Sequence, residues 1–390
     1  MITIQIIFWF SLFLILYSYL LFPEILRLLA RKRKEETKKY LPSELPFISV
    51  LIAAFNEEKV IGDKIKSVLD GNYPQKLMEI LVGSDASTDH TNQILQHLQE
   101  ENPSLHLTVF NERQGKPGII NHLAEKAMGE ILVITDANVM LDKDALSQLI
   151  SYFKEERTGL VDSRMVNTVL NSEGVSRQEK FYISREVRIK YHESLIWGSM
   201  MGPFGGCYAV RKSVYQPVPE KFLVDDFYIN MSVLKQGLFC ISNLQAVAYE
   251  QASNHPGEEF RRKKRISAGN FQNLSTFWPM IFFGKRGIGF CFFSHKVIRW
   301  FVPFLILFTL GSSILLSTES DFYLVLALAQ AGVFLSPVID HFLRIIKIQS
   351  IPLRFVSHFV LMNLALLAGF FKYLGGIKDN VWQPTSRNQD

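Results

Sequence analysis

Cysteine is scarce in this chain of 390 residues, and its three cysteines lack the spacing of a metal or disulfide site. Cys207, Cys240 and Cys291 form no CxxC pair, and an odd number does not suit a set of disulfides. The sequence therefore predicts no structural zinc and favours a reducing compartment, in which the thiols are small buried apolar groups.

Two common phosphate-binding motifs are also absent. No GxGxxG follows the first predicted strand, and no GxxxxGK[ST] occurs anywhere, which excludes the usual dinucleotide-binding fold and the P-loop NTPases. The net charge of +5 is too small to indicate nucleic acid as a partner. A bound phosphate would need a metal or basic side chains. Lys116, at the start of a predicted helix, is one candidate, and its alternative role is a solvated surface lysine.

Acidic and basic residues are missing from four long apolar runs, at 2–23, 300–318, 322–339 and 355–371. A helix that crosses a bilayer needs about 20 such residues. Seven basic residues follow the first run and none precedes it, so we expect a retained anchor with residue 31 onward in the cytoplasm. The later runs predict a C-terminal membrane region at 295–376. The last run either spans or lies at the interface, which leaves open the side of the tail at 377–390.

Residues 47–250 have the pattern of a soluble α/β domain, which follows a basic juxtamembrane linker at 24–46. Strands are predicted at 48–54, 78–82, 105–110, 131–134, 159–168 and 207–210. Helices are predicted at 57–69, 91–98, 117–128 and 142–153. Strands that alternate with helices indicate βαβ units and a mainly parallel sheet.

The segment 131–138 organises this domain. Its four apolar residues predict a buried strand, and Asp136 and Asn138 follow directly. Ligands of open α/β sheets bind at the carboxyl edge of the strands, where carboxylate and amide oxygens suit a hard divalent cation that holds phosphate. The alternative is a strand followed by an Asx turn. Other predicted strands also end in polar residues, such as Glu57 and Asp85, so we expect one nucleotide-sized site at this edge.

Two further segments carry charge toward that site. Asp225 and Asp226 precede a predicted helix, where they serve either as an N-cap or as a general base. Residues 261–265 read Arg-Arg-Lys-Lys-Arg, ahead of an aromatic-rich section. We therefore expect basic and interfacial helices over 251–294 that contact lipid or phosphate.

Taken in order, these motifs resemble the membrane-embedded family 2 glycosyltransferases, the group that includes hyaluronan, chitin and poly-N-acetylglucosamine synthases. The resemblance extends from about residue 48 to the last apolar run. It rests on six segments: 49–57 (SVLIAAFNE), 84–89 (SDASTD), Gly115-Lys116, 135–138 (TDAN), Gly205-Gly206 and Asp225-Asp226.

The resemblance implies a GT-A type fold and a nucleotide-diphosphate sugar donor, usually a UDP-sugar, with Mg²⁺ or Mn²⁺. By position, Asp226 would be the general base of one inverting displacement, and Asp136 and Asn138 would hold the metal. The donor would contact Ala54, Glu57, Asp85, Lys116, Asp136, Arg262 and Arg265, and the acceptor side would include Gly205, Gly206 and Asp225. The expected partners are the donor, a carbohydrate or lipid-linked acceptor and membrane lipids. The expected location is a bacterial inner membrane, with the catalytic domain cytoplasmic.

Two departures from the family pattern bear on metal and product. Asn138 replaces the last aspartate of the family's DxD, which predicts weaker metal binding. Arg262-Lys-Lys-Arg265-Ile266 stands where processive members have Gln-x-x-Arg-Trp, so the platform for a polymer is incomplete.

The favoured function is a polysaccharide synthase, because three C-terminal apolar runs and the interfacial helices favour one. The altered motif at 262–266 favours the alternative, single addition onto a lipid-linked acceptor. Asp85, Asp136 and Asp226 are all present, which disfavours an inactive scaffold. A transporter is disfavoured because no predicted span carries a paired charge.

Overall fold

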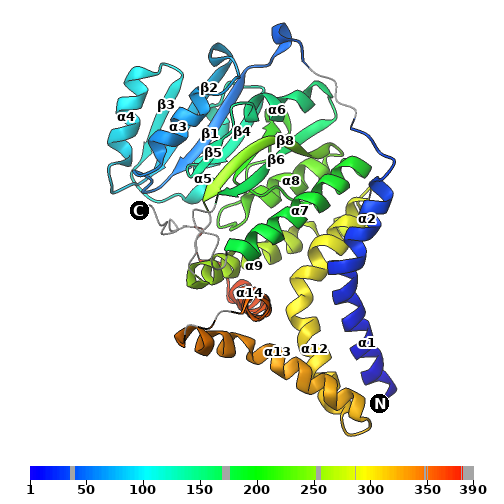
Figure 1. Ribbon diagram of the computed structural model, residues 1–390. Helices are drawn as coiled ribbons and strands as arrows, with labels where there is room; N and C mark the ends of the chain where they lie inside the picture. The colour runs from blue at the N-terminus through cyan, green and yellow to red at the C-terminus, as the bar shows by residue number, and fades with distance from the viewer. Residues whose placement is uncertain are drawn as a thin grey trace.

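The computed structural model describes residues 1–35, 40–168, 176–251, 256–285, 287–346, 348, 350–378 and 380. A soluble α/β domain lies above a set of long helices in Figure 1, and α7 and α9 lie between the two parts. The predicted fold class, an α/β domain flanked by apolar helices, is confirmed.

One mixed sheet of eight strands forms the centre of the soluble domain, in the order β3-β2-β1-β4-β7-β6-β8-β5. Pairings among β1 to β4 are parallel, as is β6 with β8, whereas β7 is antiparallel to β4 and β6, and β5 to β8. Every residue of β1 and β2 is buried, as expected for parallel strands covered on both faces. The strands are β1 (Ile48–Ala54), β2 (Met78–Asp85), β3 (Leu105–Phe110), β4 (Ile131–Asp136), β5 (Val139–Leu141), β6 (Thr158–Thr168), β7 (Cys207–Arg211) and β8 (Phe239–Gln251).

Helices cover both faces of the sheet and bury two apolar clusters. One cluster joins the sheet to α5 and α8, and the other joins it to α3 and α6. The helices of the domain are α3 (Ile61–Leu69), α4 (Thr91–Glu101), α5 (Gly115–Lys126), α6 (Ala145–Ser151), α7 (Ser176–Trp197) and α8 (Asp225–Lys235). Short 3₁₀ turns occupy Pro42–Glu44, Gln75–Leu77, Tyr152–Lys154 and Lys212–Val214.

The sequence analysis missed β5 and β8. β5 has only three residues. β8 contains polar residues at 242, 243 and 245, where its ladder with β6 shifts register. A polar stretch with an irregular ladder lacks the alternation that identifies a strand from sequence.

Four helical runs are long and apolar enough to cross a membrane: Ile2–Ala30, Ile288–Leu316, Asp321–Ile345 and Ile351–Leu374. The first comprises α1 (Ile2–Leu16), a π-helical turn (Tyr17–Leu21) and α2 (Phe22–Ala30). The second comprises α11 (Ile288–Cys291), another π-helical turn (Phe292–Val297) and α12 (Ile298–Leu316). The others are α13 (Asp321–Ile345) and α14 (Ile351–Leu374), and the short α10 (Pro279–Phe283) precedes α11. The second run begins before residue 295, so the expected boundary at 294/295 falls inside it.

The last apolar helix, α14, lies along α9 (Pro256–Phe277). Ser267 donates a hydrogen bond to the carbonyl of Leu366 (2.7 Å), and the rings of Phe271 and Phe370 are 4.9 Å apart. α9 and α14 are both seen nearly end-on in Figure 1, whereas α1 and α12 run down the picture side by side. Beyond α14, the side chain of Asn380 lies against Gly115 of the soluble domain. The described chain therefore ends on the same side as that domain.

Candidate active site

The loops after β1 and β2 are joined at the carboxyl edge of the sheet. Asn56 adopts a positive φ of 52°, and its side chain accepts a hydrogen bond from the backbone of Thr88 (2.8 Å). The backbone N–H of Glu57 donates to the hydroxyl of Thr91 (2.9 Å). These bonds place Ala54 and Glu57, two predicted donor-binding residues, at this edge, where both are buried.

Asp85, at the end of β2, is fully buried and organises the next loop. It accepts hydrogen bonds from the Nε of Arg113 (3.0 Å) and from the backbone N–H groups of Gln114 (2.6 Å) and Gly115 (3.1 Å). The guanidinium of Arg113 lies 3.3 Å from the ring centroid of Phe55. Direct contact between Asp85 and the donor remains a prediction, because the carboxylate oxygens of Asp85 accept hydrogen bonds from the protein in this structure. Sequence reasoning missed the roles of Arg113 and Phe55.

Lys116 joins the two acidic segments of the site. Its ammonium lies 2.6 Å from Asp136 and 3.8 Å from Asp225. Burial lowers the pKa of Lys116, but the negative charges of Asp136 and Asp225 raise it by more than burial lowers it. The net shift of the pKa is therefore upward. The lysine is therefore a fixed positive charge at the strand edge, and the alternative of a solvated surface lysine is wrong.

Asp136 and Asn138 suit a divalent ion shared with a diphosphate. The backbone of Asp136 is fixed by a hydrogen bond to the carbonyl of Gly206 (2.9 Å), and Asn138 donates to Glu250 of β8 (3.4 Å). Within the described ranges, no group of three His, Cys, Asp or Glu side chains forms a metal cage. Mg²⁺ bound with a nucleotide needs only one or two carboxylates beside phosphate and water, so this donor set fits. Sequence reasoning missed Glu250.

Lys64 supports this loop from inside the domain. It is fully buried in α3 and donates to the hydroxyl of Thr135 (2.8 Å) and to the carbonyl of Val139 (2.5 Å). Burial lowers its pKa to about 8. The sequence carried a signal for it, because Lys64 falls on the same helical face as Ile61, Ile65 and Val68.

Asp226 stands at the start of α8, against the glycine-rich loop. Gly205 has a φ of 82°, and a Cβ there would collide with the carboxylate of Asp226. Asp226 accepts a hydrogen bond from the backbone of Phe227 (2.6 Å). Part of Asp226 remains accessible to solvent, but burial and the neighbouring charge of Asp225 raise its pKa to about 7. A carboxylate with this pKa can accept a proton near neutral pH.

The glycine-rich loop is held from behind by polar side chains. The N–H of Gly202 donates to Asn230 (3.0 Å), and that of Phe204 to Asp162 (3.4 Å). Lys190 lies 3.4 Å from Asp162 and 3.4 Å from the ring centroid of Phe204. Gly205 and Gly206 therefore lie on a braced loop beside Asp226, the predicted base, and its neighbour Asp225, the predicted acceptor-side carboxylate.

Two buried polar atoms at this edge of the site lack a hydrogen-bond partner among the described residues. Among the described residues, the hydroxyl of Tyr208 and Oδ2 of Asp225 form no hydrogen bond. Buried polar groups are almost always paired, so these atoms suggest a place for a polar ligand group.

The two predicted arginines of α9 separate in the structure. Arg262 lies 3.6 Å from Glu259, one turn earlier on the same helix. Burial lowers the pKa of Arg265, and the nearby carboxylates of Asp225 and Asp136 offset part of that decrease. Arg265 is therefore positioned toward the site, whereas Arg262 is engaged on its own helix.

Three comparisons place this geometry among known proteins. Residues 49–218 match the family model "Glycosyl transferase family 2". The chain is 30% identical over 263 residues to a beta-monoglucosyldiacylglycerol synthase from Nostoc sp., covering 65% of this chain and 55% of that protein. It is 30% identical over 113 residues to the poly-beta-1,6-N-acetyl-D-glucosamine synthase of Staphylococcus aureus, covering 29% and 27%. The chain thus spans about half the length, or less, of these relatives.

A solved structure shares the fold over nearly the whole chain. It is a mannosyltransferase from Pyrobaculum calidifontis in complex with GDP-Man and Mn²⁺, with a TM-score of 0.71 and 19% identity, covering 94% of this chain and 99% of that one. The expected GT-A type fold is confirmed.

Proposed function

Residues 49–218 match the model of glycosyl transferase family 2. From that match we propose that they form a domain of this family, and that the chain moves a sugar from a nucleotide-diphosphate sugar, a UDP-sugar by resemblance, to an acceptor hydroxyl at the membrane surface. The observation that carries the proposal is the arrangement of Lys116 between Asp136 and Asp225, with Asp226 adjacent. It combines positive charge for a diphosphate with a carboxylate suited to be a base.

The proposed reaction is a single displacement. The acceptor hydroxyl lies against Asp226, which takes its proton as the oxygen attacks the anomeric carbon. The bond from that carbon to the diphosphate oxygen breaks, and the nucleoside diphosphate leaves with the electron pair. Lys116 and Arg265 lie where positive charge would stabilise the leaving group. A divalent ion at Asp136 and Asn138 would neutralise further diphosphate charge. One inverting step needs no covalent sugar–enzyme intermediate.

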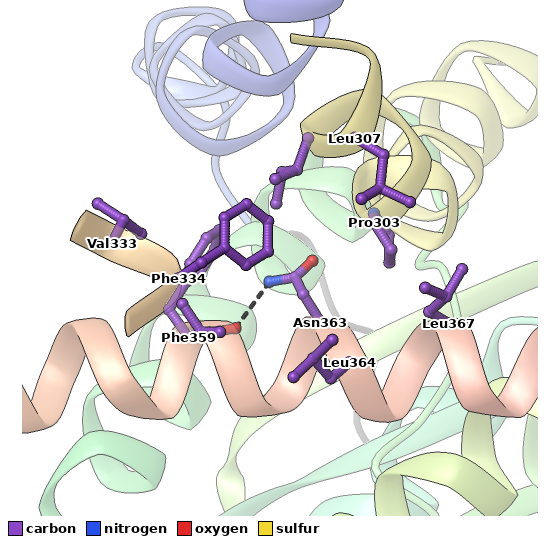
Figure 2. Close-up of a pocket in the computed structure, with 10 residues that line it drawn as sticks. Pro303, Leu307, Val333, Phe334, Phe359, Asn363, Leu364 and Leu367 are labelled. Atoms are coloured by element: carbon purple, nitrogen blue, oxygen red, sulfur yellow. Dashed lines mark hydrogen bonds between the residues drawn. The ribbon is translucent and has the colours of Figure 1, made fainter. Parts of the chain in front are cut away.

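The acceptor that these features favour is a membrane lipid, with a growing polysaccharide as the second candidate. Ile266 replaces the tryptophan of processive synthases, and Arg262 is engaged by Glu259. The pocket among α12, α13 and α14 has a volume of about 40 Å³. Asn363 is the polar residue among the labelled side chains, and it bonds to the carbonyl of Phe359 (2.8 Å; Figure 2). This pocket is too small and too apolar to pass a sugar chain. The sequence similarity to the beta-monoglucosyldiacylglycerol synthase from Nostoc sp. also supports a lipid acceptor.

We also propose that α14 lies along the membrane surface and does not cross it. The first crossing, by α1, would bring the chain to the side of the soluble domain. The run that ends with α12 would then take it across the membrane, and α13 would bring it back. Asn380 contacts Gly115 on that same side, which leaves no net crossing for α14. With the basic residues after α2, the positive-inside rule makes this side cytoplasmic.

The test is transfer by the detergent-purified chain from a panel of labelled UDP- and GDP-sugars, with Mn²⁺, Mg²⁺ or EDTA, in the presence of diacylglycerol or a membrane lipid extract. We expect metal-dependent transfer from one donor into a single chloroform-soluble product. A ladder of long water-soluble products would instead establish the polysaccharide. Absence of nucleotide release from every donor by folded protein would contradict the proposed activity.

A further inference from the structure

A second cavity, of about 450 Å³, lies where the soluble domain meets the membrane helices. It is formed by the end of α7, the turn after α8, and the segment from α10 to the start of α11. Its lining includes Trp197, Lys235, Phe239, Met280, Phe283 and Lys285. Its volume is within the range of small-molecule sites. Asp225 begins α8 and Lys235 ends it, so roughly 15 Å of helix separate this cavity from the candidate active site.

Two glycines with unusual backbone conformations shape the cavity: Gly198 lines it, and Gly287 packs against the lining residue Trp197. Gly198 has a φ of 64°, and a Cβ there would collide with the ring of Phe239. Gly287 has a φ of 72°, and a Cβ there would collide with the indole of Trp197. Left-handed backbone is readily adopted only by glycine. The sequence therefore specifies the shape of this cavity.

The charge at the cavity is positive. Lys235 and Lys285 are both exposed, and among the residues that the structure describes no carboxylate pairs with either. A third cation, the guanidinium of Arg157, lies 4.3 Å from the ring centroid of Phe239. Two lysines beside apolar walls suit a ligand with an anionic group joined to an apolar part.

The cavity also lies at the level of the membrane surface. The apolar run Ile288–Leu316 begins at its wall. On α10, Phe282 and Phe283 are 72% and 79% exposed, and Trp278 just before it is 53% exposed. Exposed aromatic residues beside the end of a span are typical of the headgroup region of a bilayer.

From these observations we propose that this cavity binds one anionic glycerophospholipid of the bilayer, with its phosphate between Lys235 and Lys285 and the start of its acyl chains against Met280 and Phe283. Cytoplasmic leaflets are rich in anionic lipids and attract basic residues near the surface. This lipid site goes beyond sugar transfer and is separate from the donor site. It would fix the height and orientation of the soluble domain on the membrane.

The test is native mass spectrometry of the detergent-purified full chain with phosphatidylglycerol or phosphatidylcholine. The variants are the double substitution Lys235→Gln/Lys285→Gln and a matched control, Lys126→Gln/Lys143→Gln, whose exposed lysines do not line the cavity. We expect wild type and control to bind one phosphatidylglycerol at least tenfold more tightly than phosphatidylcholine. The cavity variant should lose that preference at an unchanged unfolding temperature.

Two results would overturn the proposal. Equal phosphatidylglycerol binding by the cavity variant and the control would show that the lysines do not form the site. Displacement of the lipid by free glycerol 3-phosphate at an equal concentration would show that the ligand is a soluble phosphate compound. The readout is binding, so it does not depend on whether the chain transfers sugar.

Discussion

Two clusters of buried charge in this chain are built in opposite ways. The first, which we call the junction cluster, joins α7 to the helical run that contains α12. The two ring nitrogens of His295 lie 2.7 Å from Glu193 and 2.7 Å from Glu186. Lys296 and Arg299 reach Glu186 at 2.6 and 2.9 Å. Each carboxylate in this cluster therefore lies within hydrogen-bond distance of at least one basic side chain.

The second cluster, which we call the candidate-site cluster, consists of Lys116, Asp136, Asp225 and Asp226, and its charges are not balanced within the part of the protein that the structure describes. One ammonium lies among three carboxylates, Oδ2 of Asp225 has no hydrogen bond among the described residues, and the pKa of Asp226 is raised to about 7 by burial and by Asp225. Buried charges that lack partners are costly. The difference indicates that the junction cluster holds two parts of the protein together, whereas the candidate-site cluster has charges that the proposed substrate and metal would balance.

The largest expected effect is on the candidate-site cluster. Asp226→Asn should lower kcat by about 10²–10⁴-fold, because the amide cannot accept the acceptor's proton, while donor affinity stays within about twofold. Initial rates and nucleotide-sugar binding by calorimetry measure the two quantities. The exposed Asp70→Asn is the matched control. Normal turnover of Asp226→Asn would remove this residue from the mechanism.

A substitution in the junction cluster should lower the stability of the protein. Burial raises the pKa of Glu186, but His295 and Lys296 lower it by more, so the net shift is well downward and the group is an anion at neutral pH. Glu186→Gln would leave the buried cations without their counter-charge, and we expect a loss of about 3–5 kcal/mol in the free energy of unfolding.

Denaturant unfolding in detergent measures this loss, with the exposed Glu125→Gln as the control, expected within about 0.5 kcal/mol of wild type. Equal stability of the two variants would show that the junction cluster does not hold the helices to the domain.

The pH dependence separates the clusters further. The base must be deprotonated to act, and the pKa of Asp226 is about 7, so kcat/KM should be constant above that pH and fall about tenfold per unit below it. Asp225→Asn removes a like charge that raises this pKa, so the acid limb should move to lower pH. A limb that stays in place would assign the ionisation to another group.

Much of the candidate-site cluster could be predicted from the sequence. Asp136 was found because parallel strands bring their carboxyl ends to one edge, and Lys116 was found as a basic residue at the start of a predicted helix. Glu250 was missed because the polar stretch of β8 hides the strand that brings it to Asn138. The junction cluster was also missed, since no local pattern relates His295 to Glu186, 109 residues away. The sequence pattern grouped Arg262 with Arg265, but Glu259 engages only the former.

The smallest expected effect concerns the metal. Asn138 donates to Glu250 at 3.4 Å, and a second carboxylate at this position would lie beside the first. Without metal, Asn138→Asp should therefore cost up to about 1 kcal/mol in stability through like-charge repulsion. With Mn²⁺ and nucleotide, the added charge should tighten metal binding by about three- to tenfold, because site charge tunes the affinity for divalent cations. Mn²⁺ titration by electron paramagnetic resonance measures the change. Unchanged affinity would place the metal away from Asn138, and a gain abolished by the additional change Glu250→Gln would show that Glu250 shares the ion.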